Sequence, residues 1–246
     1  MGYHESLTEG RNAVLEAFRS GKTVDRLFVL DGCQDGPVKT ILREAKKQDT
    51  MVQYVKNERL DQLSETKNHQ GVIAYCAACE YAEVSDILEN AKKKGEAPFI
   101  VLLDGIEDPH NLGAIIRTAN QAGAHGVIIP KRRAVGLTAT VARTSAGAVN
   151  YTPVAKVTNL VTVMEDLKKE GMWFVCADMD GEEMYSLNLK GPIGLVIGNE
   201  GEGVSRLVKE HCDMVASIPM KGDIDSLNAS VAMGVLAYEI VRQRRF

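Results

Sequence analysis

The stretch LVIGNEGEG (195–203) decides the fold, and a second stretch of the same kind, MVASIPMKG (214–222), follows it. Each begins with a short apolar run, typical of a buried strand, and then breaks into a turn that contains glycine. In an open α/β sheet, ligands bind in the crevice beyond the carboxyl ends of the strands. We therefore predict two buried strands whose turns border one pocket.

The segment that follows these turns, SLNASVAMGVLAYEIV (226–241), predicts a helix. Ser226 is a favourable N-cap residue, and Asn228 is then expected in the first turn, where backbone N–H groups are unpaired. Apolar residues recur at helical spacing and are expected to form the buried stripe, namely Leu227, Val231, Val235, Tyr238 and Val241. The second turn is therefore expected to lead directly into a core helix.

Short apolar runs alternate with helical patterns from residue 98 onward. Further strands are expected at 99–103, 127–130 and 173–177, and further helices at 112–119 and 158–169. Strands that alternate with helices predict a mostly parallel, doubly wound sheet. Residues 98–246 are therefore expected to form one α/β domain.

The first 76 residues show the same alternation on a smaller scale. Strands are expected at 27–30, 51–55 and 71–75, and helices at 12–18 and 38–47. This pattern predicts a smaller N-terminal α/β domain, near the lower size limit for folding alone. A helical stripe at 84–91 and a polar run that ends at Pro98 mark the boundary. The expected division is a domain at 1–76, a linker at 77–97 and a domain at 98–246.

The composition is that of a globular protein. The 246 residues are 45% apolar and 25% charged, and no apolar run is long enough to cross a membrane. The N-terminal residues lack the pattern of a signal peptide, so we expect a cytoplasmic protein. Five cysteines, an odd number, argue against a disulfide scaffold, and the pair Cys76 and Cys79 lacks the further ligands of a zinc site. No metal is expected.

The charge balance does not by itself indicate a nucleic-acid partner. The net charge is −4, whereas nucleic-acid-binding domains usually show a basic balance or a basic face. Basic residues gather only locally, at 92–94, 131–133 and 242–245, and such runs are more often solvated surface. Any basic surface that binds nucleic acid is therefore expected to be local.

Three polar residues near the expected strand ends each have a structural and a functional interpretation. Asn111 is either a helix N-cap or a site residue, because asparagine is among the best caps. Arg117 flanks the apolar stripe of the same helix, so it either projects into water or reaches across the strand ends. Glu200, set between glycines, is either a plain loop carboxylate or a group that the loop positions.

Common nucleotide-binding and hydrolase motifs are absent from the sequence. The spacing of Gly198, Gly201 and Gly203 runs opposite to that of a dinucleotide-binding fingerprint, and it comes late in the chain. There is no phosphate-binding G-x-x-x-x-G-K-[ST] loop and no G-x-S-x-G elbow of a serine hydrolase. The glycine turn therefore belongs to another kind of site.

Three motifs in the second domain resemble those of the SpoU, or TrmH-type, ribose methyltransferases of the SPOUT class. They are DPHNLG (108–113) with RTA (117–119), then IGNEGEG (197–203), then IPM (218–220) with SLNASVA (226–232). They occur in the family's order, and the resemblance covers residues 98–246. The N-terminal segment is similar to the family's ribosomal-protein-like RNA-binding domain, with GRNAV (10–14) and HQGV (69–72) as its markers. With PKRRAVGL (130–137), the chain most resembles members that methylate a guanosine ribose of 23S ribosomal RNA.

The resemblance implies a fold, a cofactor and an oligomeric state. In the family, the C-terminal part threads through a loop to form a trefoil knot, although knots are close to absent among protein folds. The turns at Gly198, Ile218 and Leu227 then hold S-adenosylmethionine, largely through backbone groups. The implied cofactor-binding residues are Ala177, Gly198, Asn199, Gly201, Ile218, Met220 and Leu227. The family forms homodimers through the catalytic domain, and its active site takes residues from both subunits.

The resemblance also implies roles for the polar residues. It points to Arg117 as the catalytic cation, and a guanidinium with a pKa above about 12 is better suited to stabilise an alkoxide and grip a phosphate than to act as a base. Glu200 is expected to orient Arg117 through a bidentate pair. The residues expected to tie the loops together and contact the ribose are Asn111, Ser226 and Asn228. The implied RNA contacts are Arg11, Asn12, His69, Arg132 and Arg133.

Two other functions stay open at this point. One is a ribose methyltransferase for transfer RNA, but such members of the family usually carry short terminal helices in place of an RNA-binding domain. The other is a ribosome-assembly or RNA-binding protein that has kept the fold without catalysis. The presence of Arg117, Glu200 and Asn228 favours an enzyme.

Overall fold

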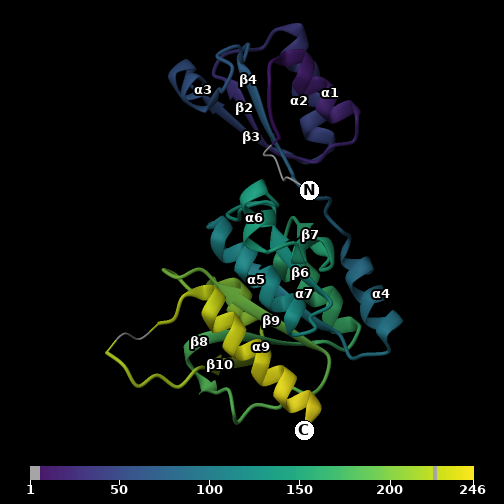
Figure 1. Cartoon of the computed structure of the whole chain (residues 1–246), viewed down its shortest axis with the longest axis vertical. Helices are drawn as coiled ribbons and strands as arrows, with labels where there is room; N and C mark the ends of the chain where they lie inside the picture. The colour runs from purple at the N-terminus through teal and green to yellow at the C-terminus, as the bar shows by residue number, and fades with distance from the viewer. Residues whose placement is uncertain (1–5, 224–225) are drawn as a thin grey trace. The chain divides into compact units, whose positions relative to one another are not determined.

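The computed structural model describes residues 6–223 and 226–246, which divide into two compact units (Figure 1). The first unit comprises residues 6–80 and the short segment 136–140, and the second comprises the other described residues. The chain divides after Glu80, so most of the segment 77–97, which we expected to be a linker, belongs to the second unit. Each unit has its own sheet and its own hydrophobic core.

The first unit is a four-stranded sheet with helices on both faces. Its strands lie in the order β1 (Ser6–Glu9), β4 (Val72–Cys76), β2 (Val24–Leu30) and β3 (Met51–Val55). Helices α1 (Arg11–Arg19) and α2 (Gly36–Lys47) cover one face, and α3 (Asn57–Leu63) packs on the other. The predicted strands and helices are confirmed, whereas β1 and α3 were not predicted.

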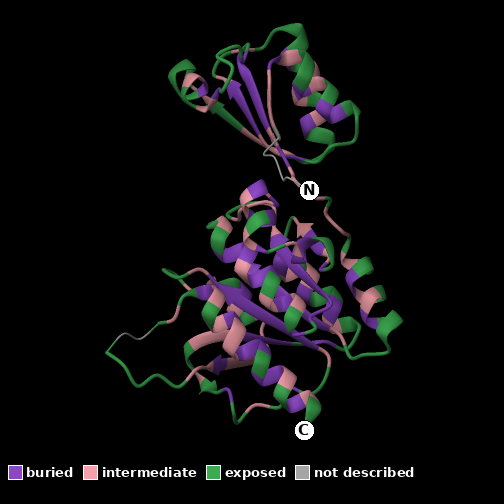
Figure 2. Ribbon diagram, in the orientation of Figure 1, coloured by how far each residue is buried: buried purple, intermediate pink, exposed green. Residues whose placement is uncertain are grey.

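The second unit is built on six parallel strands. Their order is β10 (Met214–Ser217), β8 (Trp173–Glu183), β9 (Ile193–Gly198), β5 (Phe99–Asp104), β6 (Gly126–Pro130) and β7 (Val154–Val157). All neighbouring pairs are parallel, which confirms the predicted sheet. Strands β5 and β9 are buried along their whole length (Figure 2), as expected for continuous apolar runs in a parallel sheet.

Helices precede, separate and follow these strands along the chain. They are α4 (Val84–Lys94), α5 (Pro109–Gln121), α6 (Ala139–Thr144), α7 (Leu160–Lys169), α8 (Arg206–Glu210) and α9 (Ala229–Arg245), with a 3₁₀ turn at Ala148–Asn150. Among the described residues, no helix has both the length and the apolar character needed to cross a membrane. Strand β7 and helices α6 and α8, which are all short, were not predicted from the sequence.

The sheet reverses its strand order between β5 and β9. From β5 the chain adds β6 and β7 on one side, then crosses back and places β8, β9 and β10 on the other. Asp104 at the end of β5 pairs in register with Gly198 at the end of β9. Ligand sites of open α/β sheets occupy such reversal points, beyond the carboxyl ends of the strands.

Helix α4 is part of the core of the second unit. Ile87 is fully buried and lies over Gly126, where an added Cβ would be only 2.5 Å from Ile87 Cγ1. This close approach leaves no room for a side chain at position 126 and fixes the helix on the sheet. The helical stripe predicted at 84–91 is thus confirmed.

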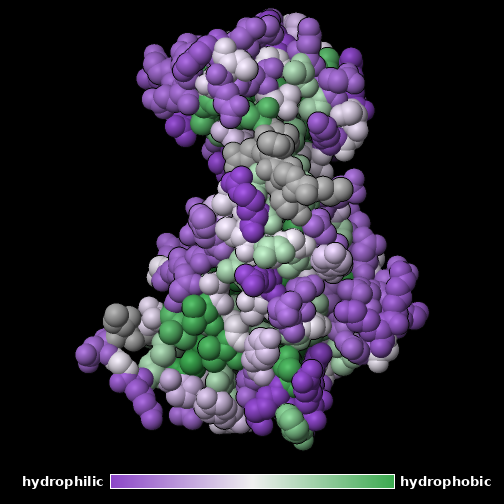
Figure 3. All heavy atoms as spheres, in the orientation of Figure 1, coloured by the Kyte–Doolittle hydropathy of each residue, from purple (hydrophilic) through white to green (hydrophobic). Residues whose placement is uncertain are grey.

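Helix α9 buries a different side from the one predicted. Its buried apolar residues are Ala229, Met233, Leu236, Ala237 and Ile240. Val231 and Tyr238, which we predicted to be in the core, are 48% and 51% exposed. The prediction was wrong because apolar residues occur on both sides of this helix, so their spacing did not identify the side that faces the sheet. Figure 3 shows a hydrophobic patch over the beginning of α9.

Two helix caps also differ from the prediction. Helix α9 is capped by Asn228, whose side-chain oxygen accepts a 3.0 Å hydrogen bond from the backbone N–H of Ser230, and not by Ser226. Helix α5 is capped by Asp108. Asn111 therefore lies buried in the first turn of α5, where its side chain is available for a contact other than capping.

A buried imidazole holds the amino end of β5. The Nδ1 atom of His125 accepts a 3.0 Å hydrogen bond from the backbone N–H of Phe99, and its Nε2 atom lies 3.0 Å from a carboxylate oxygen of Glu96. Burial lowers the pKa of His125 below its ordinary value, although the hydrogen bond to Glu96 acts in the opposite direction. The ring is therefore neutral in the folded protein, with its proton on Nε2.

We expect His125 to make the protein less stable as the pH falls. Because the folded protein binds this proton less readily than the unfolded chain, the free energy of unfolding should decrease once the pH drops below about 6.5, until the lowered pKa is passed. The variant His125→Gln should lose this part of the pH dependence. Denaturant unfolding of both proteins between about pH 7.5 and 5.5 measures it, and equal slopes would contradict the assignment.

Candidate active site

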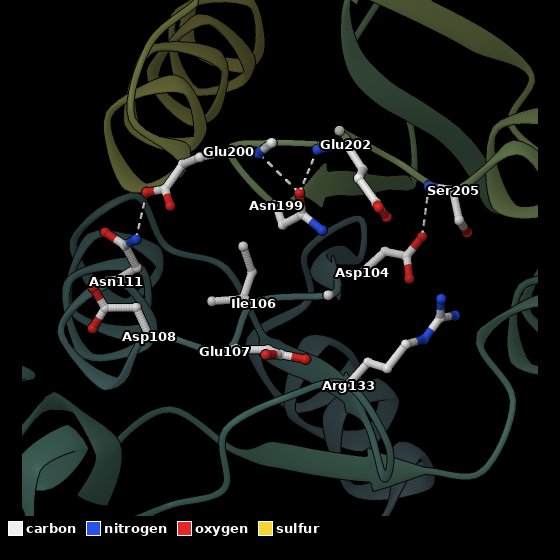
Figure 4. A pocket seen from close by; sticks show the side chains of 13 residues that line it. Asp104, Ile106, Glu107, Asp108, Asn111, Arg133, Asn199, Glu200, Glu202 and Ser205 are labelled. Carbon is white, nitrogen blue, oxygen red and sulfur yellow. Dashed lines mark hydrogen bonds between the residues drawn. The ribbon is translucent and has the colours of Figure 1, made fainter.

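The turn after β9 is set by a glycine that has no room for a side chain. A Cβ added to Gly198 would lie 1.9 Å from the backbone carbonyl carbon of Gly203, so the two ends of the turn are in direct contact. Asn199 closes the turn from inside, because its Oδ1 accepts hydrogen bonds from the backbone N–H groups of Gly201 and Glu202 at 2.9 and 2.6 Å. The turn directs the side chain of Glu200 toward α5 (Figure 4).

Glu200 binds two asparagine side chains from distant parts of the sequence. Its Oε1 accepts hydrogen bonds from Nδ2 of Asn111 at 2.5 Å and from Nδ2 of Asn228 at 2.6 Å. The Asn228 amide also donates to Oδ1 of Asn111 at 3.0 Å. One carboxylate thus joins the turn after β9, the first turn of α5 and the cap of α9. These three predicted site residues form one network.

A cleft of about 760 Å³, which we call the larger cleft, opens on one side of the glycine turn. It is bordered by β8, by the ends of β9 and β10 and by the first turn of α9, and its volume suits a ligand of cofactor size. Every residue that the resemblance implies for cofactor binding lines it: Ala177, Gly198, Asn199, Gly201, Ile218, Met220 and Leu227. Ser226 lines it as well.

Carboxylates that were not predicted as site residues also line the larger cleft. They are Asp178, Asp180, Glu183 and Glu202. Burial acts to raise the pKa of Asp178, but hydrogen bonds from Lys209, whose Nζ is 2.7 Å away, and from the backbone of Asp180 outweigh it and lower that pKa. Lys209 offsets the charge of Asp178, whereas Asp180 and Glu183 have no ion-pair partner among the described residues, so these two give the cleft negative charge that suits a cationic ligand. The position of Asp178 directly after the predicted strand 173–177 was a signal for it.

A second cavity of about 550 Å³, which we call the smaller cavity, lies at the ends of β5 and β9. It shares residues 199–203 with the larger cleft and is completed by the loops after β5 and β6. Figure 4 shows the side chains of Asp104, Glu107 and Arg133 around it. Asp104 is buried, and one of its carboxylate oxygens accepts a 2.8 Å hydrogen bond from the backbone N–H of Ser205. The two acidic residues follow a predicted strand, yet the sequence analysis did not select them.

Arg117 does not join the network. Its side chain is exposed, lines neither cavity and forms no hydrogen bond or ion pair with any residue that the structure describes. The predicted pair between Glu200 and Arg117 is therefore wrong within one chain, because Asn111 and Asn228 occupy the carboxylate. Arg117 follows Asn111 by six residues of α5, which places it about 9 Å along the axis and roughly 120° around it.

Two of the implied RNA contacts are used inside the first unit. The Arg11 guanidinium lies 2.6 Å from Asp35 and donates to the backbone carbonyl of Gln70 at 3.0 Å. His69 is buried, and its Nδ1 accepts a 3.0 Å hydrogen bond from the backbone N–H of Gly71. Both side chains hold the loops that precede α2 and β4, and their contact with RNA stays a prediction.

The other implied RNA contacts lie at the surface. Asn12 on α1 and Arg132 after β6 are exposed, and neither lines a cavity. Arg133 lines the smaller cavity and has a left-handed backbone, with φ of 54°, which is uncommon for a residue other than glycine. Within residues 6–223 and 226–246, no three His, Cys, Asp or Glu side chains are grouped so as to hold a metal ion.

Comparison with known proteins accounts for both units. Residues 98–238 match the SpoU rRNA Methylase family, and residues 7–82 match a family described as RNA 2'-O ribose methyltransferase substrate binding. The Bacillus subtilis protein YacO, named as a member of the TrmH family of tRNA/rRNA methyltransferases, is 49% identical over 96% of this chain and 94% of its own length.

Solved structures extend the comparison. An rRNA methyltransferase from Sinorhizobium meliloti with bound AdoMet is 25% identical, with a TM-score of 0.60 over 96% of this chain and 86% of that one. A TrmH/SpoU tRNA modifying enzyme from A. aeolicus is 28% identical, with a TM-score of 0.56, but it covers only 65% of this chain and 84% of its own. From the match over residues 98–238 and the nearly full-length relative, the chain belongs to the SpoU rRNA methylase family.

Proposed function

We propose that this protein is a cytoplasmic, homodimeric enzyme that transfers a methyl group from S-adenosylmethionine to a ribose 2′-hydroxyl of RNA. Its proposed target is a guanosine of 23S ribosomal RNA. The observation that carries the proposal is the network of Asn111, Glu200 and Asn228, which brings one residue from each of the three family motifs into contact.

The larger cleft fits S-adenosylmethionine in size, shape and charge. Glycine at position 198 lets the turn close against Gly203 at the edge of the cleft, and Ile218 and Leu227 supply apolar contacts for an adenine ring. The carboxylates of Asp180 and Glu183, which also line the cleft, offset the positive charge of the sulfonium and amino groups. The residues proposed to hold the cofactor are the seven that line this cleft and match the family motifs.

The reaction requires that the methyl group and the ribose 2′-oxygen be aligned and that the 2′-hydroxyl lose its proton. When bound, S-adenosylmethionine would supply an activated methyl group, which would leave its sulfur for the ribose 2′-oxygen. Holding these atoms in line is worth about 7–11 kcal/mol. We assign the ribose contacts to Asn111 and Asn228, which Glu200 keeps in place, with Ser226 at the edge of the cleft. The guanidinium of Arg117 stabilises the developing alkoxide, and a phosphate oxygen of the RNA accepts the proton.

Arg117 is proposed to act in the active site of the partner subunit. Helix α5 packs beside α9, and Thr118, the neighbour of Arg117, lies 3.5 Å from the position of a Cβ on Gly234 of α9. The outer side of α9 exposes Val231 and Tyr238, which is apolar surface that a second copy would cover. An interface there would bring the exposed guanidinium of one chain toward the cleft of the other.

The length of the structural matches supports ribosomal RNA as the substrate. The rRNA methyltransferase from S. meliloti matches nearly all of this chain, whereas the tRNA modifying enzyme matches about two thirds of it. The first unit matches a substrate-binding family, and we propose that it binds the RNA outside the active site. We also propose that residues 98–246 contain the trefoil knot of the family, because residues 98–238 match the SpoU family.

Methyl incorporation into RNA tests this function. Purified protein and labelled S-adenosylmethionine would be incubated with total RNA from a strain that lacks the protein, and the modified nucleotide would be mapped. We expect one 2′-O-methylguanosine in 23S ribosomal RNA. Label in transfer RNA would support the alternative substrate, and absence of label would support an RNA-binding protein without catalysis.

Dimers with two different defects should recover activity. If Arg117 serves the partner's site, a dimer of one Arg117→Ala chain and one Glu200→Gln chain has one intact site, and its activity should be about half that of the unaltered dimer, as two-fold symmetry requires. Each variant alone should be inactive. The mixed dimer would be isolated through two affinity tags and assayed for methyl incorporation. A mixed dimer as inactive as its parents would place Arg117 and Glu200 in the same site.

Asn228 should contribute to catalysis beyond its role as a cap. Asn228→Ala removes the cap of α9 and two hydrogen bonds of the network, one of them to a carboxylate. Asn159→Ala is the matched control, because Asn159 caps α7 by accepting from Val161 and Thr162. Both variants should lose about 1 kcal/mol of stability in thermal unfolding. Only Asn228→Ala should lose roughly 10- to 100-fold in methyl transfer rate. Equal rates in the two variants would mean that Asn228 is a cap alone.

A further inference from the structure

Charged side chains from three loops meet at the smaller cavity, where none of them has a partner among the described residues. Glu107 follows β5, Arg133 follows β6 and Glu202 follows β9, and all three line this cavity. No residue that the structure describes forms an ion pair or hydrogen bond with any of these side chains. Figure 4 shows the two carboxylates and the guanidinium around the same open space. A ligand with both anionic and donor groups would complement them.

The other carboxylates of the smaller cavity already hold its walls. Asp104 accepts a hydrogen bond from Ser205, Asp108 caps α5, and Glu200 binds the two network asparagines. Glu202 belongs to the turn that the cavity shares with the larger cleft. Glu107 and Arg133 line the smaller cavity and not the larger cleft. They are thus the charged groups found only there whose side chains form no hydrogen bond or ion pair with a described residue.

The chemistry of these two groups points to a purine nucleotide. A guanidinium binds phosphate oxygens, and a carboxylate accepts two parallel hydrogen bonds from a pair of adjacent donors. Guanine carries such a pair, N1–H and the N2 amine, on one edge. Adenine and cytosine have one amine beside a ring acceptor, and uracil has one N–H between two carbonyls, so a carboxylate meets repulsion at each of these edges.

We propose that the smaller cavity holds the base of the target nucleotide, that Glu107 selects guanine through N1–H and the N2 amine, and that Arg133 binds the adjoining phosphate. This inference rests on the proposed function, because it takes RNA as the substrate. The glycine turn, which lines both cavities, then lies between the base and the methyl donor, and the ribose lies beside Glu200. Glu107 is accordingly a specificity-determining residue.

The test compares a change in the protein with a change in the base. Transcripts that contain the mapped target would carry either guanosine or inosine, which lacks the N2 amine, at that position. With the unaltered protein, inosine should lower kcat/KM roughly 10-fold, as expected for one lost base contact. Glu107→Gln should lower kcat/KM for the guanosine transcript by roughly 10- to 100-fold. Replacing guanosine by inosine should then change kcat/KM of this variant little. A variant that is merely less stable would respond to inosine as fully as the unaltered protein.

Matched controls separate these effects from general changes of charge. Glu165→Gln alters an exposed carboxylate on α7 and should leave kcat/KM and the inosine effect unchanged. Arg133→Ala should raise KM for RNA and reduce its salt dependence, whereas Arg245→Ala at the end of α9 should do neither. Titration with S-adenosylmethionine should give the same affinity for Glu107→Gln as for the unaltered protein.

The outcomes distinguish this inference from the function on which it rests. Label in 2′-O-methylguanosine, with the inosine effect lost in Glu107→Gln, supports both. Label in another 2′-O-methyl nucleoside, or an equal inosine effect in the variant and the unaltered protein, overturns the selection by Glu107 and leaves the methyltransferase assignment intact. Absence of label in any nucleoside with the unaltered protein overturns both.

Discussion

The contact between Gly198 and Gly203 is the constraint on which the rest of the site depends. A Cβ at position 198 would lie 1.9 and 2.1 Å from the carbonyl carbon and oxygen of Gly203, so the turn closes only with glycine there. Closed in this way, it forms a wall of both cavities and directs Glu200 toward Asn111 and Asn228. A wider turn would separate the carboxylate from both amides and would change the shape of both cavities at once.

Carboxylates line both sides of this turn, and Arg133 adds a guanidinium to the smaller cavity. In the larger cleft, carboxylates such as Asp180 and Glu183 suit a cationic methyl donor. The net charge of −4 for the whole chain does not describe the charge of either cavity. Local placement of a few groups, more than the overall balance, therefore decides which ligands the protein accepts, and Arg117 adds a cation that a single chain leaves at its surface.

The sequence predicted most of the second unit, because its signals are local. Strands β5 and β9 are continuous apolar runs, and the turns at their ends break with glycine or polar residues. The cofactor-binding set was predicted through the family motifs, and the structure brings that set to one cleft. The buried side of α9 was not predictable, because both sides are apolar and only the packed sheet distinguishes them. The partners of Glu200 were not predictable, because they depend on which segments distant in sequence pack together. A motif also does not show whether a residue such as His69 contacts RNA or stabilises a loop.

The most direct measurement is titration calorimetry of S-adenosylmethionine into the unaltered protein and into Gly198→Ala. If the glycine turn forms the wall of the donor site, the unaltered protein takes up one donor molecule per chain. The variant should then give no measurable binding heat. Circular dichroism and a measurement of its oligomeric state would show that it is folded. No uptake by the unaltered protein, or equal uptake by a folded Gly198→Ala variant, would contradict the account.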